Sequence, residues 1–331
     1  MHKNSPVKII LFFALISILV ASISGCINVG SKTPEATRIP PVPEATSTST
    51  ATPARIILYD PSGLVSGEVK EVITEFASAN SLTYEQAASF DDLNGVKVMV
   101  VFGTPDALAG AASSAPETQF IAVTDGAATA SANISVIQIK AVDMAFMAGY
   151  MSALTAEDWR AGGMVVDDGN TGIANAFENG GKYLCGRCTP LYPPFISYPA
   201  VETLTSQSDV NAWSTQAEAL LRDTKANSVF IDRAGDSADV LSLFEGQILY
   251  SNNPASANLE RYGAILGVDL LQGLQQLLPE ALAGRGGKTI NTKVALVVLN
   301  NPDKISPARQ TLFEKVAQDL ADGWINPLSV P

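Results

Sequence analysis

The sequence has a single histidine, His2, and it lies in a stretch that we predict to be removed. Residues 1–25 start with the basic residues Lys3 and Lys8, continue as the uncharged run Ile9–Ile23 and end in small residues, which is the order of an export signal. Removal of this signal leaves a mature chain without imidazole. This excludes a Ser-His-Asp triad, a Cys-His pair and a histidine-built metal site.

The sequence also lacks a hydrophobic run of the length of a permanent membrane span. Ile9–Ile23 covers about 15 residues, whereas a spanning helix needs about 20. The tetrapeptide Ile23-Ser24-Gly25-Cys26 resembles the lipobox of bacterial lipoproteins, in which the cysteine thiol receives a diacylglyceryl group. We therefore expect residues 1–25 to be a lipoprotein signal peptide and Cys26 to carry the lipid that anchors the protein to the extracytoplasmic face of the cell membrane.

Basic residues are scarce. Without Lys3 and Lys8, 19 basic residues remain against 33 acidic ones, which is a net charge of −14. Such a body repels nucleic acid phosphates and anionic lipid headgroups. We expect no nucleic acid partner and a membrane attachment that depends on the lipid.

Two lobes follow a tether. Residues 26–54 combine the lipidated cysteine with a segment rich in Pro, Thr, Ser and Ala, which predicts a disordered linker. Folding is expected to start near Arg55, and the remaining chain is longer than one compact core usually holds. We predict lobe one over residues 55–140 plus 262–291 and lobe two over residues 141–261 plus 292–331, so that the chain crosses a hinge several times.

Strand and helix patterns alternate along this part of the chain. Short apolar runs rich in β-branched residues read as buried parallel strands: Ile56–Tyr59, Val98–Phe102, Phe120–Val123, Ile134–Ile137, Met164–Val166, Val229–Ile231, Ile248–Tyr250, Ala264–Leu266 and Val294–Leu299. Helical spacing lies between them: Val69–Ala79, Ala145–Leu154, Ala174–Tyr183, Ala212–Arg222, Leu270–Leu282 and Pro307–Leu320. The alternation predicts a doubly wound α/β architecture.

Polar residues follow many of these strands. In open α/β sheets ligands bind at the carboxyl ends of strands, so these residues are candidates for a binding site. The candidate ligand-binding residues are Asp60, Ser62, Phe102, Thr104, Asp125, Asp168, Asn170 and Asn252. The alternative for each polar residue is that it caps the helix that follows, because Asp, Ser and Asn are preferred N-caps whatever the function.

The pair Cys185 and Cys188 has three interpretations: a redox pair, half of a zinc site and a structural disulfide. The pair follows a predicted helix, whereas a redox cysteine is activated at the start of one. No histidine remains to complete a zinc site, and outside the cytoplasm the pair is expected to be a disulfide. Residues 283–289 resemble the end of a phosphate-binding loop, but Leu282 stands where the first glycine is required. We expect no cofactor, no metal and no enzymatic activity, with a hydrolase as the third hypothesis.

A family resemblance lies in the middle of the chain. Phe146-Met147-Ala148-Gly149-Tyr150-Met151-Ser152-Ala153 is similar to the "FLAGYLAA" helix of the basic membrane lipoprotein family, and Phe177-Glu178-Asn179-Gly180-Gly181 resembles its "F..GF..G" helix. Phe120 to Asp125 is similar to the family's "FAIVD" strand. The resemblance spans about residues 55–327 and implies the type I periplasmic-binding-protein fold, with Asp125 contacting the ligand.

The resemblance further implies a substrate-binding lipoprotein that delivers a nucleoside or a similar small polar solute to an ABC permease. The sequence departs from the family at two places. Residues 60–64 lack the Phe-Asn pair that follows the first strand, and residues 264–269 lack the family's lysine. A related branch of the family is similar to regulatory lipoproteins, so the alternative function is a sensor that signals to a protein partner.

Overall fold

The computed structural model describes residues 53–61, 65–103, 106–124, 128–169 and 172–329. They belong to one compact unit that spans residues 51–331. Among the residues described, no helix combines the length and the apolar character that crossing a bilayer requires.

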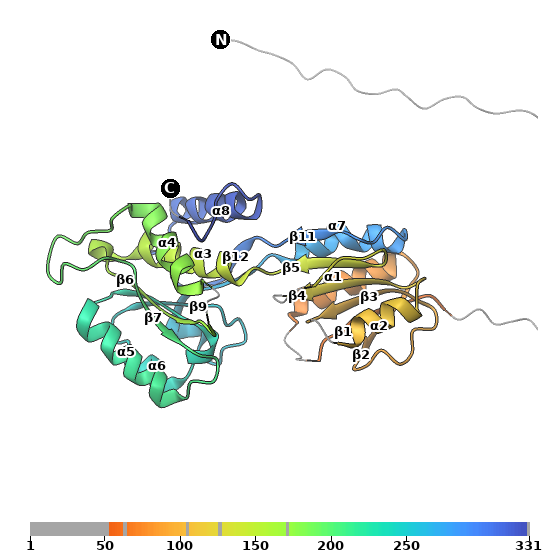
Figure 1. Ribbon diagram of the computed structural model, residues 1–331, viewed down its shortest axis with the longest axis horizontal. Helices are drawn as coiled ribbons and strands as arrows, with labels where there is room; N and C mark the ends of the chain where they lie inside the picture. Colours follow the sequence, from red (N-terminus) through yellow and green to blue (C-terminus); the bar gives the residue numbers. More distant parts are fainter. Residues whose placement is uncertain (1–52, 62–64, 104–105, 125–127, 170–171, 330–331) are drawn as a thin grey trace, which may run out of the picture. The chain divides into compact units, whose positions relative to one another are not determined.

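The first of two sheets has six parallel strands in the order β11-β5-β4-β3-β1-β2. These strands are β1 (Arg55–Tyr59), β2 (Thr83–Ala87), β3 (Val96–Phe102), β4 (Gln119–Thr124), β5 (Ile134–Gln138) and β11 (Thr289–Asn291). Helices α1 (Gly67–Ala79) and α7 (Leu270–Leu282) pack on one face, and α2 (Ala107–Ser114) packs on the other (Figure 1). The sheet is thus covered on both faces, as buried parallel strands require.

The second sheet also has six strands, in the order β12-β10-β9-β8-β6-β7. These strands are β6 (Ala161–Val166), β7 (Ala200–Leu204), β8 (Ser228–Ile231), β9 (Ile248–Ser251), β10 (Tyr262–Val268) and β12 (Val294–Leu299). One face carries α3 (Ala141–Thr155), α4 (Ile173–Cys185) and α8 (Pro307–Ala321), and the other carries α5 (Val210–Thr224) and α6 (Ala238–Ser242). Short 3-10 turns complete the lobe: η1 (Glu157–Trp159), η2 (Arg233–Gly235) and η3 (Leu259–Arg261).

Helices α3 and α4 approach each other closely because each has a glycine at the crossing. A Cβ atom on Gly149 would lie 1.8 Å from the carbonyl oxygen of Phe177, and one on Gly180 would lie 1.8 Å from that of Phe146. The contacts are reciprocal. The glycines of the motifs that carry the family resemblance therefore serve helix packing.

The predicted doubly wound α/β class is confirmed, but one boundary is wrong. The segment Tyr262–Val268 was expected in lobe one, and it pairs instead with β9 and β12 in the second sheet. The chain re-enters the first lobe only at α7. The predicted strand Val294–Leu299 is antiparallel to β10 and lies at a sheet edge, with Val297 46% exposed. An apolar run indicates a strand but does not say which sheet or direction it takes.

Three chain crossings connect the lobes: β5 to α3, β10 to α7 and β11 to β12. Neighbouring crossings are hydrogen-bonded to each other. The backbone N–H of Thr292 donates to the carbonyl of Gln138 at 3.0 Å, and the N–H of Asp269 donates to the carbonyl of Lys293 at 2.8 Å. A hinge of this kind joins two rigid lobes through a few residues at element ends.

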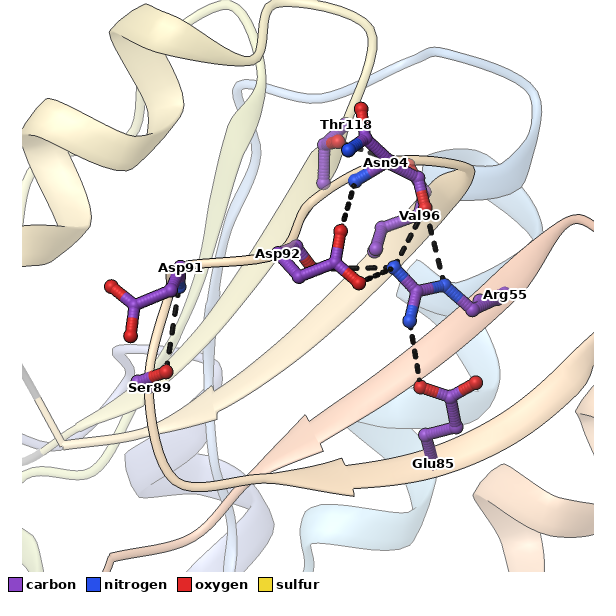
Figure 2. Close-up of polar contacts among 8 residues, drawn as sticks. All are labelled: Arg55, Glu85, Ser89, Asp91, Asp92, Asn94, Val96 and Thr118. Carbon is purple, nitrogen blue, oxygen red and sulfur yellow. Dashed lines mark hydrogen bonds and ion pairs between the residues drawn. The ribbon is translucent and has the colours of Figure 1, made fainter. Parts of the chain in front are cut away.

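Arg55 fixes the start of the first lobe. Its guanidinium forms ion pairs with Glu85 at 2.8 Å and Asp92 at 3.0 Å and donates to the carbonyl of Asn94 at 2.7 Å (Figure 2). Strand β1 is thereby tied to both its neighbours, since Glu85 lies in β2 and Asn94 precedes β3.

Candidate functional site

The carboxyl ends of the parallel strands place polar residues along one edge of each sheet. In the first sheet Asp60 follows β1 and Phe102 ends β3, and these strands are neighbours. In the second sheet Asp168 follows β6 and Asn252 follows β9, with β8 between them. This is the edge at which ligands bind in open α/β sheets.

Four of the eight predicted ligand-binding residues lie outside the described residues: Ser62, Thr104, Asp125 and Asn170. The same holds for Cys26, the predicted lipidation site. Their roles stay predictions.

Asp60 is hydrogen-bonded to the residue that leads into α1. Its carboxylate accepts a hydrogen bond from the backbone N–H of Val65 at 3.1 Å, just before Ser66 caps α1. Phe102 is half-buried and packs against the apolar cluster beneath α1 and α7. Next to it, Gly103 has φ +92° and donates to the carbonyl of Val123 at 2.8 Å, a conformation that glycine adopts without steric cost.

Asp168 is exposed, and its carboxylate accepts from the backbone N–H of Ser206 at 2.8 Å. This bond joins the loop after β6 to the loop after β7. An exposed carboxylate at this edge is an acceptor suited to the hydroxyl groups of a polar solute.

Asn252 connects the loops after β8 and β9. Its Oδ1 accepts from the backbone N–H of Arg233 at 2.7 Å, and its Nδ2 donates to the carboxylate of Asp232 at 3.1 Å. Asp232 also accepts from the N–H of Ala234 at 3.0 Å, so it caps η2. The capping interpretation therefore holds for Asp232, and it holds equally for Asp269, which accepts from Gln272 at the start of α7.

A second polar network joins the loops after β8 and β9 to the start of β10, and sequence reasoning missed it. Asp236 accepts from Asn253 Nδ2 at 2.7 Å and from Tyr262 Oη at 2.8 Å. Burial and the neighbouring carboxylate of Asp236 raise the pKa of Tyr262 well above its usual range, so this hydroxyl remains a donor. The signal in the sequence is the second aspartate, four residues after Asp232.

Two further aromatic residues near strand ends, Tyr59 and Tyr250, have partners inside the protein. Tyr250 is fully buried and donates to Thr155 Oγ1 at 2.7 Å, and burial raises its pKa to about 12. Tyr59 packs on Phe90 with ring centroids 4.7 Å apart. Phe102, at the end of β3, is half-buried.

Cys185 and Cys188 form a disulfide at the end of α4. Cys188 is 2% exposed, and this buried position is distant in the topology from the strand ends, because α4 starts at that edge and runs away from it. Within the part of the chain that the structure describes, no group of three or more His, Cys, Asp or Glu side chains could hold a metal ion.

Comparisons with solved structures agree with this architecture. An ABC transporter solute-binding protein from Conexibacter woesei superposes with a TM-score of 0.59 at 15% identity, over 83% of this chain and 98% of that one. One from Aeropyrum pernix gives 0.50 at 12% identity, over 83% and 93%. AraP, an arabinose-binding protein from Geobacillus stearothermophilus, gives 0.50 at 13%, over 76% and 97%.

No protein-family model matches the sequence, and no curated protein matches it in sequence. What the comparisons establish is the fold. The two parallel-sheet lobes, joined by three crossings, form the type I periplasmic-binding-protein fold.

Proposed function

We propose that the protein is an extracytoplasmic solute-binding lipoprotein of an ABC importer, anchored through Cys26, that holds a nucleoside or similar small polar solute between its lobes. The observation that carries this proposal is the pair of polar sheet edges, each built from strand ends, on two lobes joined by a three-crossing hinge. Closure of such lobes around a solute stabilises the closed state by the contacts that form only there.

The chemistry of the strand ends favours a ligand with several hydroxyl groups. Asp168 offers an exposed carboxylate, and the Asn252 network holds the adjacent loops in place before a ligand arrives. Preorganised acceptors of this kind suit the ring hydroxyls of a sugar or a ribose. Phe102 supplies an apolar surface on which a base or the apolar face of a sugar would pack.

Membership of the basic membrane lipoprotein family is part of this proposal. The helix motifs around Gly149 and Gly180 support it, and they are packing motifs. Since the residues that would select a nucleoside lie at the strand ends, packing motifs do not distinguish a nucleoside from a pentose. The experiment must therefore separate these two ligand classes.

The test is thermal unfolding of residues 51–331 with purine and pyrimidine nucleosides, free nucleobases, pentoses, hexoses and amino acids. A ligand at 100 times its dissociation constant adds about 2.7 kcal/mol to the free energy of unfolding, which raises the midpoint measurably. A shift with nucleosides alone supports the full proposal, whereas a shift with pentoses alone replaces the nucleoside by a sugar. No shift with any compound contradicts solute binding and favours the regulatory alternative.

A further inference from the structure

The segment between α4 and β7 forms a long loop that projects from the second lobe (Figure 1). We call residues 186–199 the apolar loop. It exposes large hydrophobic side chains that most of the surface lacks: Leu191 is 79% exposed, Tyr192 68% and Phe195 69%. Grouped exposed apolar residues on a soluble domain mark an interaction surface.

The apolar loop is firmly attached to the lobe at both ends. The disulfide holds its start, and Tyr198, which is fully buried, donates to the carbonyl of Thr224 at its end. In the middle, the backbone N–H of Leu191 donates to the carboxylate of Asp158 at 2.6 Å, and this bond lowers the pKa of Asp158. The exposed side chains are therefore presented by a fixed backbone.

Arg160 holds the tip. Its guanidinium donates to the carbonyls of Tyr192 at 3.1 Å and Pro193 at 3.0 Å. Asp158 and Arg160 both bind backbone atoms of the loop, so the side chains of Leu191 and Tyr192 stay exposed to solvent.

Two cations lie in or next to the apolar loop: Arg187 is exposed, and Lys182 forms an ion pair with Glu178 at 2.5 Å. No Asp or Glu lies between Glu178 and Glu202, whereas Lys182 and Arg187 do. A hollow of about 450 Å³ beside the loop is lined by both cations, by the hydroxyl-bearing Thr189 and Ser197, and by Gly186, Phe195 and Ile196. Cations, hydroxyls and an apolar wall together fit a phosphate group that is attached to a hydrocarbon.

We infer that the apolar loop docks on the surface of a phospholipid bilayer, with Leu191, Tyr192 and Phe195 in the interfacial region and Arg187 at the lipid phosphates. Aromatic and basic side chains are the residues that favour this region. The acidic groups next to the loop are paired, Asp158 with Arg160 and Glu178 with Lys182. Charges more than about 8 Å away are screened at physiological ionic strength.

The length of the tether, residues 27–54, places the bilayer within reach of the apolar loop. The 28 residues from 27 to 54 reach about 90 Å when extended, at roughly 3.3 Å per residue. A folded body of this size has a radius of gyration of roughly 20 Å. If Cys26 is lipidated, as proposed above, the second lobe can therefore reach the bilayer, which is present at high effective concentration.

The test uses residues 51–331, which contain both sheets and every helix that the structure describes, so no lipid anchor contributes. Co-sedimentation is measured with vesicles of phosphatidylcholine alone and of phosphatidylcholine with phosphatidylglycerol. The combined variant Leu191→Ser, Tyr192→Ser, Phe195→Ser is expected to lower the partition coefficient at least tenfold. The control, Val210→Ser, Leu312→Ser, Trp324→Ser, removes three exposed large hydrophobic side chains from elsewhere on the same lobe and should change it less than twofold.

Arg187→Glu should weaken binding to the anionic vesicles severalfold and leave binding to phosphatidylcholine unchanged. Since Arg187 is exposed, this single variant keeps the test decisive where the triple variant fails to fold. Absence of vesicle binding, an equal loss in the control variant, loop-dependent dimerisation, or saturable binding of free glycerol phosphate without vesicle binding would each overturn the inference. Solute-induced thermal shifts report on the opposite edge of the sheet, so they separate failure here from failure of the proposed function.

Discussion

The amide of Asn252 donates a hydrogen bond to the carboxylate of Asp232 at 3.1 Å, while its carbonyl oxygen accepts from the backbone of Arg233 at 2.7 Å. One side chain thereby joins the ends of two neighbouring strands, β8 and β9. Both of its polar groups are used inside the protein. Its role at the candidate site is to position the loops that meet a solute.

Asn252→Ala should lower the free energy of unfolding by about 1 to 2 kcal/mol, because two hydrogen bonds are lost and a backbone N–H is left without its partner. Affinity for the solute identified in the ligand panel should fall at least tenfold, since the loops are no longer held in place. Urea unfolding and ligand titration measure the two effects. Asn80→Ala, which removes a 2.8 Å hydrogen bond at the opposite edge of the first sheet, is the control and should leave affinity unchanged. Equal affinity in both variants would contradict the positioning role.

Gly180→Ala tests the close crossing of α3 and α4. The new methyl group would collide with the carbonyl of Phe146, so we expect a loss of about 3 kcal/mol in the free energy of unfolding. Gly110→Ala in α2, where no atom lies within 4 Å of the added Cβ, should be neutral or stabilise by up to about 1 kcal/mol. Similar effects of the two substitutions on the unfolding midpoint would show that packing does not explain the motif.

The helices and strands show which elements can be predicted from the sequence. The apolar patterns of Ala145–Leu154 and Leu270–Leu282 predicted both helices. Helix α7 has an apolar face, whereas α3 is apolar all round because it is buried on nearly every side. Helix α2, which reads ALAGAASS, was missed because small residues leave no apolar period. Strand β2, which reads TYEQA, was missed because it lies at a sheet edge and is largely polar.

The candidate site was predicted in part for a similar reason. The carboxyl ends of the parallel strands of a sheet lie at one edge, so Asp168 and Asn252 follow from strand positions alone. The hydrogen bond that Tyr262 donates to Asp236 depends on the path of the loop after β8. Loop paths are determined by side-chain hydrogen bonds that no periodicity encodes.

Arg55→Ala should destabilise the first lobe by about 1 to 3 kcal/mol. The guanidinium is 13% exposed and satisfies two carboxylates and a carbonyl, so its removal leaves several partners without a donor (Figure 2). Arg222→Ala is the matched control, because its ion pair with Asp223 is 68% and 61% exposed and should contribute less than about 0.5 kcal/mol. Denaturant unfolding measures the loss of free energy of unfolding in both variants. Equal losses would show that burial of the guanidinium does not strengthen its interactions.

Asp143 gives the protein a pH-dependent stability. It lies in the first turn of α3, directly after a hinge crossing, and is 4% exposed with Oδ2 lacking a hydrogen-bond partner. Burial raises its pKa from 3.8 to about 6, and the charge of Lys140 opposes this only in part. Below pH 3.8 the carboxyl is neutral in both the folded and unfolded states and carries no penalty. Above pH 6 it is charged in both, and the folded state bears a cost of about 3 kcal/mol.

Asp143→Asn removes this charge while retaining the shape of the side chain. The variant's free energy of unfolding, relative to the unmodified protein, should therefore rise by about 2 to 3 kcal/mol between pH 4 and pH 8. Taking the difference between two pH values cancels any constant cost of the buried amide. Asp223→Asn serves as the control: Arg222 lowers the pKa of that exposed carboxyl, so its substitution should give no gain with rising pH. Urea titrations at the two pH values provide the measurement, and a pH-independent difference for Asp143→Asn would mean that this carboxyl is hydrated in solution.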